Sequence, residues 1–143
     1  MNGYGQRQYR HTQVTTTDKG RLIVLLYEGA IRFLHQAREC AEAGDVAGKC
    51  NYINRALDII AELNQSLNMN EGGELSTNLR RLYLFWSEHL IQAKIKKDTK
   101  QIDEVIQMLS SLNDAWSTVA SQPEAQDAVP KTDGQNVRAQ ITV

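Results

Sequence analysis

An unbroken apolar run near the start of this chain restricts its fold more than any other feature. The run is Leu22-Ile23-Val24-Leu25-Leu26-Tyr27. In a helix it covers more than about one and a half turns, so its side chains point in every direction. A helix of a small bundle normally buries one stripe and exposes the opposite side to water. We therefore expect a cover in addition to the bundle neighbours, either the N-terminal segment of the chain or a partner.

The composition favours a single all-helical domain. The chain has 143 residues, of which 41% are apolar and 23% are charged, a size and mixture that suit one domain with one core. Good helix formers dominate its middle. It has only two prolines, both beyond Gln122, and few short β-branched runs between turn signals. Strands are therefore not expected.

Charge, hydropathy and cysteine content disfavour several classes of protein. A net charge of −1 and a pI near 6.3 argue against a nucleic-acid binder. The first twenty residues lack the apolar core of a signal peptide, and the run at residues 22–27 is too short to insert into a membrane. Cys40 and Cys50 are too few for a disulfide framework. We therefore expect a cytoplasmic protein with reduced thiols.

Helical periodicity and capping residues predict four helical segments. The first is expected from about Lys19 to Ala43, with Asp18 as its N-cap and Gly44 directly after its end. The second begins after Asp45 and has an apolar stripe at steps of three and four residues. That stripe consists of Val46, Cys50, Ile53, Leu57, Ile60, Leu63 and Leu67.

The third and fourth segments follow a turn at residues 68–73. The third is expected to begin near Glu74 or Leu75 and to end at Lys96-Lys97-Asp98, and Thr99 is expected to cap the fourth. The third stripe contains Leu75, Leu79, Leu82, Trp86, Leu90 and Ala93, with Tyr83 beside it. The fourth contains Ile102, Val105, Leu109, Leu112, Trp116 and Val119.

Short connections between helices of similar length predict an antiparallel up-down four-helix bundle. We place the bundle at residues 18–120. Residues 1–17 show no helical period and are predicted to form a flexible N-terminal arm. Residues 121–143 contain Pro123, Pro130 and Gly134 and are predicted to form a disordered C-terminal tail.

The sequence contains no recognisable pattern of catalytic or metal-binding residues. His11, His35 and His89 are isolated, and the two cysteines lack metal-ligand spacing. Gly72-Gly73 lacks the phosphate-binding loop pattern, and the carboxylates are scattered over polar faces. We therefore expect no metal, no cofactor and no enzymatic activity.

Two alternatives involve charged or titratable side chains. Histidine-phosphotransfer domains are also four-helix bundles, with one exposed histidine, and His89 or His35 would take that role. Neither is followed by the Lys-Gly pair expected beside a phosphoryl group. A local excess of positive charge is read either as a solvated helix end or as a site for an acidic partner; it consists of Lys94, Lys96, Lys97 and Lys100.

Motifs in the N-terminal arm and the first two segments resemble those of the flagellin-specific export chaperone family, FliS. The family pattern begins with a tyrosine and, five residues later, a valine, here Tyr9 and Val14. A Thr-rich stretch then leads into LI-x-x-LY-x-G, which is found at residues 22–29. The second segment resembles the family's A-x-x-II-x-EL at residues 56–63.

The resemblance continues through the third and fourth segments. Leu82-Tyr83 and the stretch at 90–93 are similar to the family, as are Glu104-Val105 and the sequence Asp-Ala-Trp at 114–116. The chain departs from the family pattern at three places: Lys19-Gly20 in place of Pro-Gly, Phe85 in place of a second tyrosine, and Lys94 in place of asparagine.

The resemblance implies a cytoplasmic chaperone without enzymatic activity. Such a chaperone binds the disordered C-terminal segment of flagellin in an apolar groove, prevents premature polymerisation and delivers flagellin to the flagellar type III export apparatus. In this family the N-terminal arm can cover part of the groove when the partner is absent. An exposed groove would also allow two copies of the chain to form a homodimer.

The residues expected to contact the arm or the partner follow from the apolar run and from the resemblance. Leu22 and Ile23, at a helix start, are expected to be exposed to the arm or the partner. For Leu26, Ile60 and Leu63 an ordinary core position is equally expected, and Gly29 and Ala30 would let a helix approach closely. The complete set is Tyr9, Val14, Leu22, Ile23, Leu26, Tyr27, Ala30, Ile60, Leu63 and Tyr83.

Overall fold

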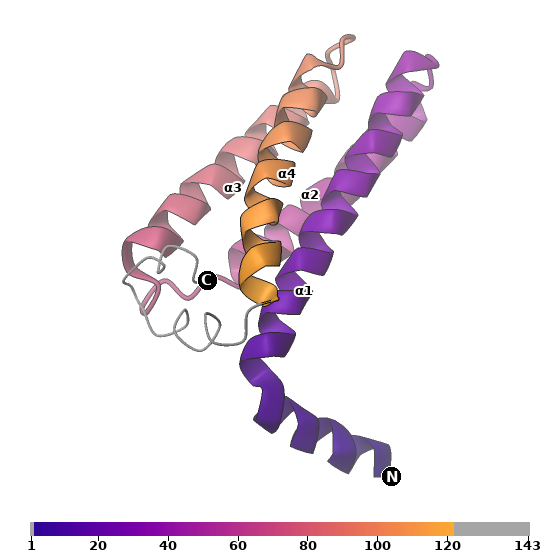
Figure 1. Ribbon diagram of the computed structural model, residues 1–143. Coiled ribbons are helices and arrows are strands. Elements are labelled where there is room, and N and C mark those ends of the chain that lie inside the picture. The colour runs from indigo at the N-terminus through magenta and orange to yellow at the C-terminus, as the bar shows by residue number, and fades with distance from the viewer. Residues whose placement is uncertain (1, 122–143) are drawn as a thin grey trace.

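The computed structural model contains four helices in an antiparallel bundle (Figure 1), which confirms the predicted fold class. The structure describes residues 2–121, with side chains from Asp18 onward. Helix α1 spans Asn2–Glu42, α2 Val46–Gln65, α3 Gly73–Ala93 and α4 Lys100–Ala120. Consecutive helices pack against each other, and α4 also packs against α1. Helices α1 and α3 therefore lie diagonally across the bundle.

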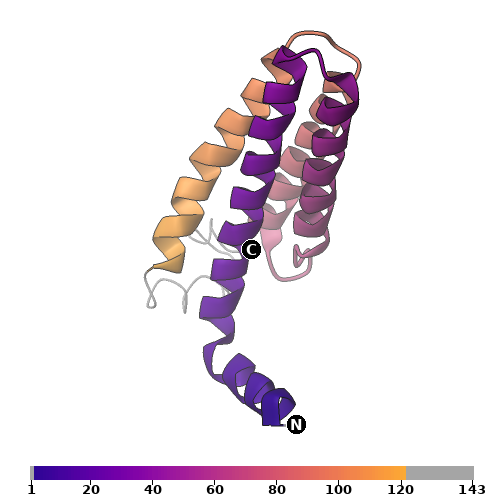
Figure 2. The ribbon, with the colours of Figure 1, turned by 90° about the vertical axis from the view of Figure 1, so that its right-hand side faces the viewer.

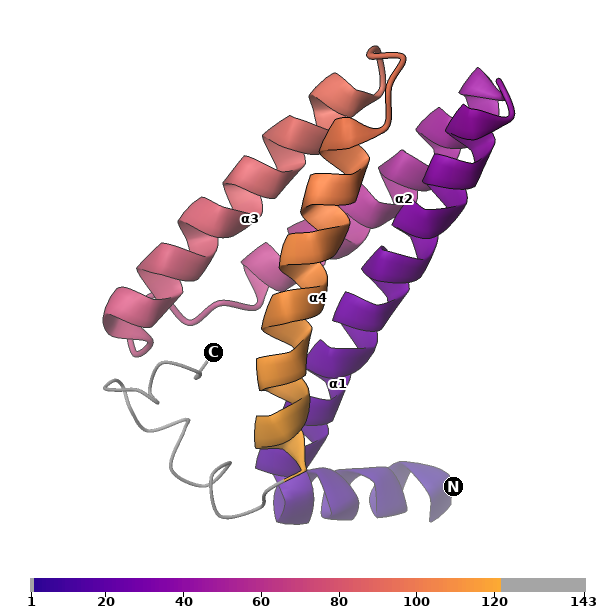
Figure 3. The same cartoon turned by 45° about the horizontal axis from the view of Figure 1, so that its top comes forward.

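The two ends of the bundle are referred to by their loops. The upper end carries the α1–α2 turn at residues 43–45 and the α3–α4 loop at residues 94–99 (Figure 3). The lower end carries residues 18–25 of α1, the α2–α3 turn at residues 66–72 and the end of α4 (Figure 2). None of the described helices is long and apolar enough to cross a membrane.

Helix α1 begins earlier than the sequence pattern predicted. It starts at Asn2, so the expected N-cap Asp18 lies inside it. No proline interrupts residues 2–18, and nothing else there forces a helix to stop. The N-terminal part of α1 extends past the lower end and bends away from the bundle (Figures 1 and 2). The flexibility of residues 1–17 stays a prediction, and all but the first residue of the predicted tail at 121–143 lies outside the described residues.

The turn between α1 and α2 forms as predicted. Gly44 has a φ of +80°, a left-handed conformation that glycine adopts without a steric penalty. Asp45 accepts a hydrogen bond at its Oδ1 from the backbone N–H of Gly48 at 2.9 Å. This bond confirms Asp45 as the N-cap of α2.

The boundaries of α3 and α4 differ slightly from the prediction. Helix α3 begins at Gly73 and ends at Ala93, before the three residues expected to end it. Thr99 does precede α4, but it makes no side-chain cap bond to the backbone. Its hydroxyl instead donates to Asp103 Oδ2 at 3.4 Å. The predicted end of α4 at Ala120 is confirmed.

Four aromatic side chains fill the middle and lower part of the core. The hydroxyls of Tyr27 and Tyr83 lie 2.8 Å apart, and Trp86 and Trp116 each contact the Tyr27 ring edge-on with centroids 6.2 Å apart. Burial raises the pKa of Tyr83 to about 12 and also raises the pKa of Tyr27. The buried indole of Trp116 confirms its predicted core position.

All three of the stripes predicted for α2, α3 and α4 need correction. On α3, Ser76 and Tyr83 are buried, whereas Leu75 and Leu82 are only half-buried. Val46 is 63% exposed, so the buried stripe of α2 begins with Lys49 and Ile53 instead. On α4, Asn113 is buried whereas Leu112 is only half-buried. A polar residue therefore occupies a core-facing position that an apolar stripe alone does not identify.

Candidate partner-binding surface

The structure divides the apolar run of α1 into buried and exposed side chains. Ile23 and Tyr27 point into the core, where Ile23 is 7% exposed and Tyr27 is fully buried. Val24 and Leu26 are half-buried against the core. Leu22 and Leu25 remain 56% and 55% exposed. The bundle thus covers four of the six side chains, and the two leucines have no comparable cover within the described part of the chain.

The exposed Leu25 lines a cleft between the lower part of α1 and the end of α4. Its volume is about 300 Å³. From α1 the cleft is lined by Arg21, Val24, Leu25 and Glu28, and from α4 by Ser117, Ala120 and Ser121. We call this the α1–α4 cleft. Its apolar wall lies between a cation and a carboxylate, an arrangement suited to an amphipathic segment rather than to a purely apolar molecule.

Six of the ten residues expected in the groove are core residues in this structure, and one of them, Ile23, was expected to be exposed. Tyr27, Ala30, Ile60, Leu63 and Tyr83 are all at most 1% exposed. A partner that docks on this conformation therefore cannot contact them. Their helical period identified an inward face, but period alone does not separate a core from a groove. Leu22 and Leu26 keep accessible surface, while the side chains of Tyr9 and Val14 lie outside the described residues.

Gly29 serves packing within the bundle. A Cβ at this position would come within 3.2 Å of Ile59 Cδ1 on α2, which is tighter than an ordinary van der Waals contact. The absent side chain therefore allows α2 to approach α1. Close approach of a helix was expected here, and the helix that approaches belongs to the same chain.

A second exposed apolar surface on α3 was not identified from the sequence. Leu84 and Ile91 are more than half exposed, and Ile95 follows in the α3–α4 loop. We call these three residues the α3 patch. Their spacing of seven and four residues is a helical repeat, and this repeat, offset from the core stripe, is the signal that would have revealed the patch.

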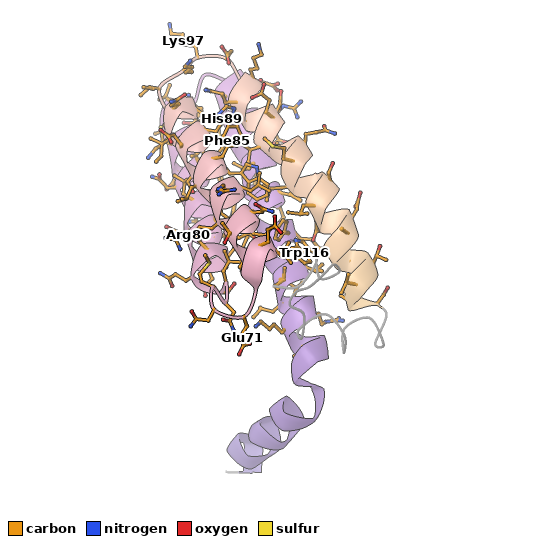
Figure 4. The ribbon with its side chains drawn as sticks, turned by 90° about the vertical axis from the view of Figure 1, so that its left-hand side faces the viewer. Glu71, Arg80, Phe85, His89, Lys97 and Trp116 are labelled. Atoms are coloured by element: carbon orange, nitrogen blue, oxygen red, sulfur yellow. The ribbon has the colours of Figure 1, made fainter. Side chains whose placement is uncertain are left out.

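The two histidines whose side chains the structure describes lie on different helices, His35 on α1 and His89 on α3. His89 Nε2 lies 2.6 Å from Glu104 Oε1, and its ring stacks on Phe85 with centroids 4.8 Å apart. Figure 4 shows His89 and Phe85 on α3, with Lys97 at the upper end of the bundle. His35 is exposed on α1. In the part of the chain that the structure describes, no group of three histidine, cysteine or acidic side chains is placed to hold a metal ion.

Part of the positive charge at the upper end is used for packing. Lys94 Nζ donates to Asn54 Oδ1 at 2.9 Å, which joins α3 to α2. The nearby Lys49, itself buried, donates to the backbone carbonyl of Lys96 at 2.8 Å. Lys96, Lys97 and Lys100 are exposed, as expected for a solvated helix end.

An all-helical bundle with exposed apolar surface and a shallow cleft defines a class of helical protein-binding modules. The comparisons with known proteins identify which one. A model of the family described as flagellar protein FliS matches residues 1–123. The chain belongs to the FliS family, the flagellar secretion chaperones.

Three relatives illustrate the similarity. The flagellar secretion chaperone FliS of Salmonella typhimurium is 34% identical over 116 residues, which cover 80% of this chain and 86% of the relative. FliS of Bacillus subtilis is 35% identical over 119 residues, covering 83% and 87%. FliSB of Pseudomonas aeruginosa is 35% identical over 108 residues, covering 76% and 86%.

Family membership confirms the non-enzymatic chaperone class and the cytoplasmic location that the motifs implied. The chain is therefore a flagellar secretion chaperone and not a histidine-phosphotransfer domain.

Proposed function

We propose that this chaperone binds the disordered C-terminal segment of flagellin, which folds into a helix on its surface and enters the α1–α4 cleft. Binding keeps flagellin from polymerising and delivers it to the flagellar type III export apparatus. The observation that carries this proposal is the exposure of Leu22 and Leu25 beside a cleft whose lining is both apolar and charged, as an amphipathic helical segment requires. The family name, flagellar secretion chaperone, supports the choice of client.

The energetics require more contact than the cleft alone supplies. Covering the exposed half of a leucine is worth roughly 1 kcal/mol. Ordering a disordered segment costs about 2–5 kcal/mol. Leu22 and Leu25 together therefore only approach this cost, and a bound segment must bury further apolar surface. The α3 patch is the second such surface, so we propose that the segment extends from the cleft around the bundle to α3.

The N-terminal residues complete the proposal. Tyr9 and Val14 precede the exposed leucines in the chain, so they are candidates to cover Leu22 when flagellin is absent. This arm would compete with flagellin, and the bound fraction of the arm would lower the apparent affinity. Removing residues 1–17 should therefore strengthen flagellin binding or leave it unchanged.

A charge placed in the cleft tests the site. Leu25→Asp should weaken binding of a flagellin C-terminal peptide at least about tenfold, because a carboxylate would be buried against apolar surface. Calorimetry should show a negative heat-capacity change with the wild-type chain and only a weak dependence on salt. Ile23→Asp is unsuitable for this test, since Ile23 belongs to the core.

Val46→Asp is the matched control. Val46 is an exposed aliphatic residue on a helix but lies at the upper end, far from the cleft. This variant should bind the peptide like the wild type, and both variants should keep the helical circular-dichroism signal. If Leu25→Asp binds as tightly as Val46→Asp, the cleft is not the site. If the wild-type chain retains flagellin lacking its C-terminal segment as well as intact flagellin, the client segment is wrong.

A further inference from the structure

The two loops at the upper end of the bundle carry charges of opposite sign. Residues 39–48, around the α1–α2 turn, contain three exposed carboxylates and no cation: Glu39, Glu42 and Asp45. Residues 94–100, which form the α3–α4 loop and the first position of α4, contain four lysines and one aspartate. We call these segments the acidic turn and the basic loop. Their formal charges are therefore −3 and +3.

Contacts within the chain neutralise little of this charge. Among residues 18–121, the only ion-pair contact of either segment joins Glu42 Oε2 to Arg38 Nε at 3.8 Å, and Arg38 lies closer to Asp103, at 3.0 Å. Lys49, the residue after the acidic turn, is buried, and its amine donates to the backbone carbonyl of Lys96. This bond holds the two segments next to each other, but it pairs the amine with a carbonyl and not with a carboxylate.

Each of the two segments also exposes one aliphatic side chain. Val46 in the acidic turn is 63% exposed, and Ile95 in the basic loop is 83% exposed. These are the two largest exposed fractions of any large apolar side chain in the described part of the chain. The upper end therefore presents two apolar side chains, one surrounded by carboxylates and the other by lysines, and neither is covered by the bundle.

This arrangement is complementary to itself under two-fold symmetry. In a two-fold interface, a residue that meets a second residue on the partner is also met in return. The acidic turn and the basic loop lie at the same end of the bundle (Figure 3). A two-fold axis across that end, between the two segments, places the acidic turn of each copy on the basic loop of the other and Val46 opposite Ile95. We propose that two copies of this chain associate head to head through their upper ends.

The size of the surface makes this dimer weak. With helices about 10 Å across, the end of a four-helix bundle offers roughly 400 Å² per copy. Two such faces bury roughly 800 Å², which is less than the about 1,200 Å² of a standard stable interface. We expect a transient dimer with a dissociation constant of roughly 0.1 mM. Because its charges are exposed, salt should weaken it.

The dimer goes beyond the proposed function and does not depend on it. Head-to-head association leaves both α1–α4 clefts open, at the two far ends of the dimer, and of the α3 patch it covers only Ile95. A dimer through the exposed groove would instead block the client site. Each copy can therefore bind its client whether or not the dimer forms, and changes at the upper end should not alter peptide binding.

Charge reversal tests the contact in the full-length chain. One variant reverses the basic loop with Lys96→Glu and Lys97→Glu, and the other reverses the acidic turn with Glu39→Lys and Glu42→Lys. Sedimentation equilibrium from about 10 µM to about 1 mM spans the expected dissociation constant. Each variant alone should associate at least about tenfold more weakly than the wild type, because like charges now face each other. An equimolar mixture of the two variants should regain the dimer, since each face then meets its opposite.

Two matched controls separate this contact from unspecific effects. Arg80→Glu with Arg81→Glu makes the same change of charge on α3 well below Lys97 (Figure 4), and this variant should associate like the wild type. Ile95→Ser should weaken the dimer about threefold or more, because it removes apolar surface from the contact. Leu84→Ser, on an exposed aliphatic residue of α3, should leave association unchanged.

The outcomes decide the proposal in either direction. Restoration of the dimer in the mixture, together with weakening of the wild-type dimer about tenfold between low and high salt, would establish the head-to-head contact. A wild-type chain that stays monomeric over the whole concentration range would refute it. Association that survives both charge reversals, or that the mixture does not restore, would show that copies meet through another surface. Circular dichroism of each variant confirms that the bundle is folded.

Discussion

The upper and lower ends of the bundle are built from different contacts. At the upper end, polar groups join neighbouring helices: Arg38 Nε lies 3.0 Å from Asp103 Oδ1 between α1 and α4, and Gln101 Nε2 donates to Gln92 Oε1 at 3.1 Å between α4 and α3. Lys49 ties α2 to the α3–α4 loop. These contacts fix the register of the helices where the loops are short.

The lower end instead combines aromatic packing with exposed apolar surface. Trp116 and Tyr27 fill the core there, while Leu22 and Leu25 face outward beside the cleft. The buried Asn113 Oδ1 has no hydrogen-bond partner among the described residues. The upper end thus carries the polar contacts between helices, whereas the lower end carries the α1–α4 cleft; exposed apolar side chains occur at both ends, with Val46 and Ile95 at the upper one.

The largest expected effect lies between the two ends, in the aromatic core. Trp86→Ala should lower the free energy of unfolding by about 3–5 kcal/mol, because it removes a fully buried indole and leaves a cavity. Phe85→Ala, next in sequence but 47% exposed, should cost far less. Urea denaturation of both variants measures the difference. Similar costs would show that α3 is rotated from its assigned register.

Alkaline pH should destabilise the same core. The pKa of Tyr83 is raised from 10.0 to about 12 and that of Tyr27 is also raised, mainly by burial. The folded state therefore favours the neutral hydroxyls. This contribution is fully present below pH 10 and is lost as pH rises from 10 through 12, at about 1–3 kcal/mol for Tyr83. Denaturation between pH 9 and pH 12 should show the loss, and a chain with Tyr27→Phe and Tyr83→Phe should show much less of it.

Removing the hydrogen bond between Lys49 and the α3–α4 loop should also lower the free energy of unfolding. Lys49→Met keeps the apolar stem but removes the donor to the Lys96 carbonyl, so we expect a loss of about 1–3 kcal/mol. Lys97→Met, on an exposed side chain of the same loop, should change stability by less than about 0.5 kcal/mol. Equal effects would mean that the buried amine does not hold the loop.

At the lower end, removing a buried polar group should have the opposite sign. Asn113→Leu eliminates an acceptor that lacks a partner among the described residues, and we expect stability to rise by up to about 1 kcal/mol. Thermal unfolding compares this variant with Asp114→Leu, an exposed neighbour. A clear loss of stability in Asn113→Leu would show that this amide has a partner, for example an ordered water.

The smallest effect is expected for the ion pair between α1 and α4. Arg38 and Asp103 keep 38% and 45% of their side-chain surface exposed, and pairs open to solvent contribute about 0–1 kcal/mol. A double-mutant cycle with Arg38→Ala and Asp103→Ala should therefore give a coupling energy below 1 kcal/mol. A larger value would make the upper end more dependent on charge, and more sensitive to salt, than its exposure indicates.

Much of the bundle could be predicted because its signals are local. Gly44 and Asp45 specify their turn through backbone geometry and one short hydrogen bond, and the stripes of α3 and α4 repeat at helical spacing. The candidate site was harder to predict, because six of its ten expected residues satisfy the same period as a core. The α3 patch was missed because only the inward stripe of α3 was considered, although the patch has its own repeat at helical spacing on the outward face.

The sequence by itself determined the all-helical class, the four segments, most of their boundaries and the family. These properties depend on spacing, capping residues and motifs, which do not require knowledge of the neighbours. Only the tertiary structure decided that Ile23 and Tyr27 are buried while Leu22 and Leu25 are exposed, and that Asn113 faces inward beside a half-buried Leu112. A helical period defines which residues share a face, but the depth of burial depends on the position of the packed neighbours.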